Sequence, residues 1–185
     1  LNNYGTVNSN ITNVVVTCTT NGYYVGGSVT GLSGGTLGLH LESSSGGQDL
    51  TTNSDGNFTF ASSLSYNSDY TVTVSSQPYD KTCLVFNGSG YASSSSSNAV
   101  SISCSANTYS INVTVSGLNI GNSFNLSLNS GTYTSVDHNG LYTWSGYHTG
   151  DPYTINMDIQ PAGQTCSIQN GSGTIDAADA NITVT

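Results

Sequence analysis

The chain has 185 residues and carries 10 acidic side chains against a single base, Lys81, which gives it a formal net charge of −9. With one lysine and no arginine it has no basic patch to neutralise phosphate groups, so its composition excludes nucleic-acid binding and attachment to anionic lipid. Only 6% of the residues are charged and 35% are hydrophobic, which predicts a β-rich protein coated with Ser, Thr, Asn, Gly and Tyr, of the kind found outside cells.

The chain opens with a segment that repeats its own end. Residues 1–17 align with residues 169–185 without a gap, and Cys18 follows directly. Because strand side chains alternate between two faces, Val14, Val16 and Cys18 share one face, as expected for the last strand of a domain. We predict that it is a spare closing strand, too apolar to remain without a partner. The residues assigned to this strand are Ile11, Val14, Val15, Val16 and Cys18.

Two copies of one domain follow, predicted at residues 19–104 and 105–185. Tyr70-Thr-Val-Thr-Val returns as Tyr153-Thr-Ile-Asn-Met, and both copies continue through Gln-Pro and Thr-Cys to Asn-Gly-Ser-Gly. Short alternating runs separated by turn residues predict an all-β fold of two tandem immunoglobulin-like or transthyretin-like β-sandwich domains.

Turn residues predict where some of these strands are joined. Asp55-Gly56 in the first copy and Asn139-Gly140 in the second lie between strand-like segments. Such dipeptides are the strongest short-range signal for a β-hairpin, so we predict a hairpin at each of them.

The four cysteines indicate disulfides and an oxidising compartment. We expect Cys83 and Cys104 to pair within the first copy, where closing a loop of about 20 residues stabilises by about 3 kcal/mol. We expect Cys18 to bond Cys166 of a neighbouring subunit. Since no cysteine lies in a C-x-x-C pair or near a histidine, no metal site and no cofactor are predicted.

Three spaced phrases of the second copy are specific as a set: Gln160-Pro-Ala-Gly-Gln-Thr-Cys166, Asn170-Gly-Ser-Gly-Thr174 and Asn181-Ile-Thr-Val-Thr185. They resemble a tandem repeat common in bacterial secreted and surface proteins, of the form Q-P-x-G-Q-T-C…N-G-S-G-T…N-V-x-V-T-C, and Asn13-Val-Val-Val-Thr-Cys18 fits its final phrase. The first copy departs from the pattern at Asp80-Lys81. The resemblance implies an immunoglobulin-like surface domain without enzymatic activity. In architecture, the leading strand also resembles the donor strands of extracellular filament subunits such as archaeal threads and donor-strand pili.

The expected location is extracellular or at the cell surface. No apolar run reaches the roughly 18 residues that span a bilayer, so no membrane insertion is predicted, and we expect Leu1 to begin a mature chain whose signal peptide has been removed. Seven N-x-S/T sequons are candidate glycosylation sites, though a sequence this rich in Asn, Ser and Thr also produces them by chance. They are at Asn10, Asn57, Asn87, Asn112, Asn125, Asn170 and Asn181.

Residues that could carry chemistry are few, and no enzyme is predicted. His40, His138 and His148 are isolated in the sequence, and no G-x-S-x-G nucleophile motif occurs. Asp176-Ala-Ala-Asp179 lacks the spacing of a calcium loop and is expected to be a solvated loop.

The aromatic residues Trp144, Tyr142, Tyr147 and Tyr153 could form a sugar-stacking platform. The repeat equates Tyr142 and Trp144 with Phe58 and Phe60, however, which favours a packing role.

We therefore expect a structural subunit of an extracellular filament that polymerises with identical subunits by adding its leading strand to a neighbour. The alternative is a non-polymerising surface adhesin or carbohydrate-binding array with glycans as partners. Three other accounts of the leading strand remain open: a fragment of a longer tandem array, a strand folded back with an intrachain Cys18–Cys166 bond, and a disordered leader.

Overall fold

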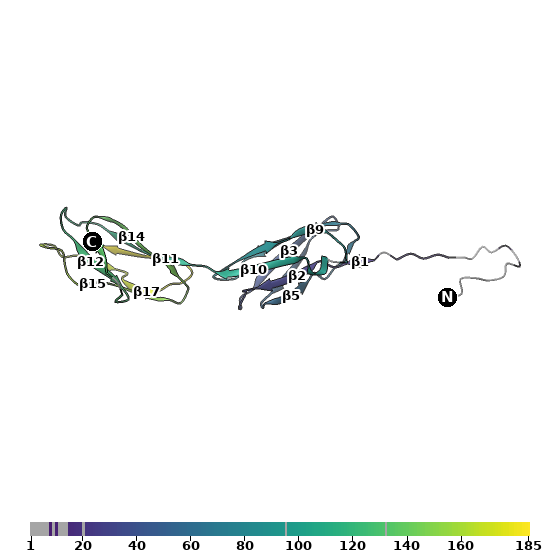
Figure 1. The fold of residues 1–185 in the computed structure, drawn as a ribbon, viewed down its shortest axis with the longest axis horizontal. Coiled ribbons are helices and arrows are strands. Elements are labelled where there is room, and N and C mark those ends of the chain that lie inside the picture. The colour runs from purple at the N-terminus through teal and green to yellow at the C-terminus, as the bar shows by residue number, and fades with distance from the viewer. Residues whose placement is uncertain (1–7, 9, 11–14, 20, 95, 132) are drawn as a thin grey trace.

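The computed structural model describes residues 8, 10, 15–19, 21–94, 96–131 and 133–185. In this part of the chain the regular structure consists of β-strands and one short 3-10 helix, η1 (Ser96–Asn98). Figure 1 shows two β bodies in a row, with the described residues 15–19 leading away from the first. None of the described residues forms a helix long and apolar enough to cross a bilayer.

Two four-stranded sheets build the first body. One has the order β5 (Gly56–Thr59), β2 (Gly26–Thr30), β10 (Val100–Ala106), β8 (Lys81–Phe86). The other has the order β4 (Gln48–Thr52), β3 (Leu37–Ser43), β7 (Asp69–Ser76), β9 (Ser89–Tyr91). Two further strands, β1 (Gly22–Tyr23) and β6 (Leu64–Ser65), form a separate two-stranded antiparallel sheet.

The second body repeats this order strand for strand. Its first sheet runs β14 (Gly140–Tyr147), β11 (Tyr109–Val115), β18 (Ala180–Val184), β16 (Ile168–Gln169). Its second sheet runs β13 (Tyr133–Val136), β12 (Phe124–Leu128), β15 (Pro152–Met157), β17 (Ser172–Thr174). The predicted all-β fold with two tandem β-sandwiches is confirmed.

Each body has its own hydrophobic core. The buried residues form one cluster that includes Leu39, Phe60 and Ile102 and a second that includes Ile111 and Leu126. Along β7 the burial alternates, as the sequence pattern predicted for a strand with one face in the core.

The last strand of each sandwich lies inside its sheet and not at an edge. β10 pairs in parallel with β2 and antiparallel with β8. β18 likewise pairs in parallel with β11 and antiparallel with β16. A parallel pair must be joined by a crossover connection, here through the rest of the domain. In chain order, β2 and β10 are the first and last strands of their sheet, as β11 and β18 are of theirs, and each pair lies in the middle of that sheet.

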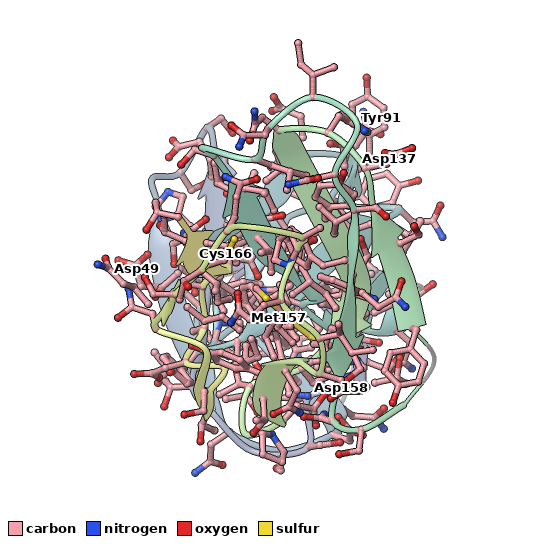
Figure 2. The ribbon with its side chains drawn as sticks, turned by 90° about the vertical axis from the view of Figure 1, so that its left-hand side faces the viewer. Asp49, Tyr91, Asp137, Met157, Asp158 and Cys166 are labelled. Carbon is pink, nitrogen blue, oxygen red and sulfur yellow. A yellow bond between two sulfur atoms is a disulfide. The ribbon has the colours of Figure 1, made fainter. Side chains whose placement is uncertain are left out.

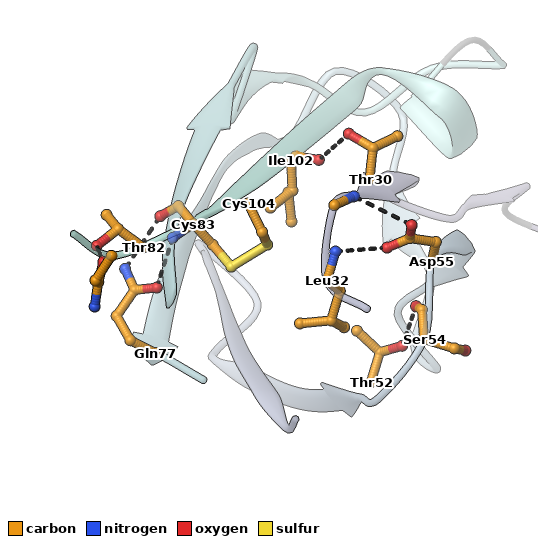
Figure 3. The surroundings of a disulfide bond; sticks show 12 residues. Thr30, Leu32, Thr52, Ser54, Asp55, Gln77, Thr82, Cys83, Ile102 and Cys104 are labelled. Carbon is orange, nitrogen blue, oxygen red and sulfur yellow. Dashed lines mark hydrogen bonds between the residues drawn. A yellow bond between two sulfur atoms is a disulfide. The ribbon is translucent and has the colours of Figure 1, made fainter. Parts of the chain in front are cut away.

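The predicted hairpins at Asp55-Gly56 and Asn139-Gly140 are wrong. The strands on either side of Asp55-Gly56, β4 and β5, pair with different neighbours in different sheets, so the chain crosses between sheets at this turn. The Asp55 carboxylate accepts hydrogen bonds from the Leu32 amide at 2.7 Å and the Gly31 amide at 3.1 Å (Figure 3).

Asn139 makes the equivalent hydrogen bonds in the second sandwich. Its Oδ1 accepts a hydrogen bond from the Leu118 amide at 2.8 Å, and its Nδ2 donates to the Leu118 carbonyl at 3.0 Å. In both copies the Asp-Gly or Asn-Gly turn ties the sheet crossing to the loop that follows the first strand.

Candidate assembly site

Cys83 and Cys104 form a disulfide in the first sandwich. They lie directly opposite each other on β8 and β10, and both are buried. Figure 3 shows the bond joining the two strands. The disulfide therefore fastens an edge strand to the central last strand.

A glutamine clamp precedes each of the two equivalent cysteines. Gln77 accepts a hydrogen bond from the Cys83 amide at 2.8 Å and donates one to its carbonyl at 3.1 Å. Gln160 makes the same two bonds to Cys166, at 2.7 and 3.1 Å. The glutamine side chain thus makes the two hydrogen bonds that the backbone of a neighbouring strand would make to the cysteine. This explains why glutamine and cysteine recur together in the repeated Gln-Pro…Thr-Cys phrase.

Cys166 is a free, partly exposed thiol. The ladder of the second sandwich pairs Ile168 with Val184 and Gln169 with Thr183. In the register of the first sandwich, the position opposite Cys166 comes one residue after Thr185. Figure 2 looks along the molecule from the side of the second sandwich and labels Cys166. The adjacent Ser167 exchanges two backbone hydrogen bonds with Thr185, at 2.7 and 3.1 Å, and Figure 1 marks the C end in the half of the second sandwich that lies away from the first.

The described part of the predicted closing strand is exposed. Val15 and Val16 have 83% and 81% of their surface in solvent, and Cys18 is a free, exposed thiol. Two further residues of the predicted strand, Ile11 and Val14, lie outside the described residues.

The strand whose sequence the leading segment repeats, β18, is already in place in the second sandwich. β18 is hydrogen-bonded on both sides, and the side chains of Ile182 and Val184 are buried. A strand from another copy finds no free edge on β18, so it must displace β18 or pair at an outer edge of the sheet.

Two of the histidines, isolated in the sequence, lie beside carboxylates in the fold. His40 lies opposite Asp49 across β3 and β4, with Nδ1 2.7 Å from Asp49 Oδ1 and Nε2 3.2 Å from Glu42 Oε2. The hydrogen bonds to Asp49 and then Glu42 raise the pKa of His40. His138 Nδ1 lies 2.6 Å from Asp137 Oδ1, which lowers the pKa of Asp137.

Both of these histidine–carboxylate contacts lie at the surface. Among the described residues, however, no group of three His, Cys, Asp or Glu side chains is placed to hold a metal ion.

The loop at Asp176–Asp179 is exposed to solvent, as expected, and both of its carboxylates also accept hydrogen bonds. The Tyr79 hydroxyl donates to Asp176 at 2.7 Å, from the first sandwich to the second. The Ser110 amide donates to Asp179 at 2.7 Å.

The Tyr109 hydroxyl donates to Asp80 at 2.8 Å, so a second bond crosses between the bodies. The bonds to carboxylates raise the pKa of both Tyr79 and Tyr109.

The sequon asparagines lie mostly in solvent. Asn112 is partly buried, and its Oδ1 accepts a hydrogen bond from Thr143 at 2.9 Å. The exposed ones are Asn10, Asn57, Asn87, Asn125, Asn170 and Asn181.

No family model matches the chain, and no curated protein matches it. Among solved structures, two B repeat units of the collagen-binding protein of Staphylococcus aureus are 16% identical with a TM-score of 0.32, over 89% of this chain and 49% of that one. The Bacillus anthracis TIE protein is 14% identical with a TM-score of 0.43, over 86% of this chain and 33% of that one. The Streptococcus pyogenes major pilin T-13 is 15% identical with a TM-score of 0.32, over 90% and 97%.

The chain thus spans about half of the first of these structures and a third of the second. Because the three TM-scores are 0.43 or lower, we argue the function from the residues of this chain.

Proposed function

We propose that this chain is a non-catalytic structural subunit of an extracellular filament, in which residues 19–104 and 105–185 are the two domains. The observation that carries the proposal is the repeat of residues 169–185, which include β18, as residues 1–17. A segment that resembles a buried central strand in sequence, but has Val15 and Val16 in solvent, is suited to pair with another copy.

The two ends of this contact lie on opposite sides of the molecule. Residues 15–19 lead away from the first sandwich, whereas Cys166 is next to Ser167, which pairs with Thr185 at the C end marked in the second sandwich (Figure 1). A contact between two different surfaces is heterologous and adds subunits head-to-tail. Such growth gives an open filament unless the rotation closes a ring.

We propose strand exchange as the form of the contact. The repeat equates Val14 with Ile182 and Val16 with Val184, so a neighbour's segment can bury equivalent side chains between β11 and β16 while β18 is displaced. In this register Cys18 falls opposite Cys166, as Cys104 falls opposite Cys83. A disulfide there would make dissociation slow.

The test is polymerisation of the full chain, followed by non-reducing electrophoresis and electron microscopy. We expect a ladder of oligomers that collapses with reductant, and filaments that disappear when residues 1–18 are deleted. Cys18→Ser and Cys166→Ser should each remove the ladder, whereas the double variant Cys83→Ser/Cys104→Ser should keep it. Filaments from the truncated chain, or a lone monomer band under oxidising conditions, would refute the proposal.

A matched pair of variants tests the strand itself without touching a thiol. Val16 corresponds to the buried Val184, and Val15 corresponds to the partly buried, opposite-facing Thr183. We expect Val16→Asp to prevent assembly, because it puts a charge into the core, and Val15→Asp to permit it. Equal effects of the two substitutions would count against an inserted strand.

A further inference from the structure

A hollow of about 340 Å³ opens on the surface of the second sandwich. Its lining consists of two aromatic side chains from β14 and three residues from the end of β12 and the turn that follows. The volume is at the small end of the range of ligand pockets, about 300–1,000 Å³. The lining residues are Leu128, Asn129, Gly131, Trp144 and Tyr147.

The corresponding place in the first sandwich is filled. The repeat equates Trp144 with Phe60. Tyr147 pairs with Tyr109 in the second sandwich, as Leu64 pairs with Tyr23 in the first, so Tyr147 and Leu64 are also equivalent. Phe60 and Leu64 are only 1% and 2% exposed, whereas Trp144 and Tyr147 are half-buried, with part of each ring packed on the core.

A hydrogen-bonded closure accounts for part of this difference. In the first sandwich the Gln48 side chain accepts a bond from the Ser62 amide at 2.8 Å and donates to its carbonyl at 3.1 Å. In the second, the Asn129 side chain turns toward β15, where it accepts from the Thr154 amide at 2.7 Å and donates to the Pro152 carbonyl at 3.1 Å. The turn after β12 is thereby held on β15.

A β-bulge directs Tyr147 to the hollow. Tyr109 pairs with Tyr147, but the next residue, Ser110, pairs with Ser145, so Gly146 is the extra residue. Its φ of 91° is in the region that favours glycine. A bulge of this kind bends the strand and re-aims the side chain beside it.

The lining selects for a neutral ligand. None of the five lining residues carries a charge, and Lys81, the only lysine or arginine of the chain, is in the first sandwich. An anion would therefore meet no counter-charge, and a cation would meet no lining carboxylate. Aromatic rings beside amide and backbone polar groups suit a ligand with one apolar face and a rim of hydroxyls.

We propose that this hollow binds one ring of a neutral saccharide, packed against Trp144 and Tyr147. The inference does not depend on filament assembly, since the hollow belongs to one sandwich and none of the lining residues is in the leading segment or β18.

The chain's only tryptophan provides the assay. Trp144 lines the hollow, so its fluorescence reports directly on occupancy when the full chain is titrated with neutral oligosaccharides of glucose, galactose, mannose and N-acetylglucosamine. We expect at least one of these to shift the emission with saturation. Tyr147→Leu, which installs the residue of the first copy, should weaken binding about tenfold or more, whereas Tyr91→Phe, at an exposed tyrosine of the first sandwich, should not.

A second variant guards against a folding artefact. Trp144→Phe also installs the residue of the first copy, and its binding is measured by calorimetry, with circular dichroism as the check of folding. We expect binding to be lost while the fold is retained. The proposal is overturned by an unchanged spectrum and no heat across the panel, by binding of only sialylated or quaternary ammonium ligands, or by wild-type binding in folded Tyr147→Leu.

Discussion

Individual polar side chains hold the turns of this protein where a backbone partner is lacking. Asp55 is the clearest case, because one carboxylate receives the amides of Gly31 and Leu32 at the crossing between sheets. Leu32 is fully buried, so its amide would have little access to replacement water.

Removal of this carboxylate should destabilise the first sandwich. We expect Asp55→Ala to lower the free energy of unfolding by about 1–3 kcal/mol, the cost of leaving the amide of the buried Leu32 unpaired, as measured by urea denaturation. Asp55→Asn should keep most of the stability, since Asn139 serves this role in the second copy. Asn53→Ala, in the same loop, is the control, and an equal loss there would show that the effect is not specific to Asp55.

The pH response of His40 follows from its two carboxylate neighbours. The folded state raises its pKa above the ordinary value of about 6.5. Its contribution to stability is therefore fully present below the pKa of the unfolded state, and is lost as the pH rises through the folded pKa. NMR titration of the imidazole should show the raised pKa, and Asp49→Asn should lower it, whereas the remote Asp69→Asn should leave it unchanged.

The sequence could not predict this His–carboxylate pair. His40 and Asp49 are nine residues apart and meet only because β3 and β4 pair in one particular register. By contrast, the glutamine clamp was visible as a repeated phrase, although its hydrogen bonds were not.

At the scale of strands, local patterns predicted which segments are extended but not always which neighbours they find. Alternation of apolar and polar residues predicted β7, because a strand with one buried face needs an apolar side chain at every second position. The hairpin predictions were wrong because β5 pairs with β2 and not with the preceding strand, β4, which belongs to the other sheet. This pairing depends on how the two sheets pack around the core and not on the turn residues alone. The pairing of Cys18 with Cys166 stays a prediction.

The glutamine clamp gives a test at this scale. We expect Gln160→Ala to free the backbone around Cys166, because two hydrogen bonds to it are lost, and so to speed modification of this thiol by a maleimide. The chain used should carry Cys18→Ser, so that labelling reports on Cys166. Gln169→Ala, on the neighbouring strand β16, is the matched control, and similar rates in both variants would contradict the clamp.

For the molecule as a whole, the hydrogen bonds between the sandwiches matter most. Tyr79 to Asp176 and Tyr109 to Asp80 cross between the two bodies at 2.7 and 2.8 Å. Both tyrosines have a raised pKa, so the neutral hydroxyl is favoured by the contact. The contact is therefore complete below about pH 10, the ordinary tyrosine pKa, and is lost as the pH rises through the raised value.

Loss of one of these bonds should loosen the arrangement of the sandwiches without unfolding either. We expect Tyr79→Phe to broaden the distribution of distances between them in small-angle X-ray scattering at neutral pH. The wild-type chain should change in the same direction above pH 10. Tyr24→Phe, at an exposed tyrosine before β2, is the control. A distribution for Tyr79→Phe that matches wild type at both pH values would show that the bond does not hold the bodies together.

The parallel pairing of first and last strands also decides how each sandwich responds to tension. The chain enters the first sandwich next to the start of β2 and leaves from the end of β10, and these two strands lie side by side from Gly27 with Val100 to Thr30 with Ser103. A pull on both ends of the chain therefore slides one strand along the other, which loads the ladder hydrogen bonds together and does not open them one by one. β11 and β18 repeat the geometry. Each sandwich is thus built to resist stretching along the chain far better than peeling from an edge.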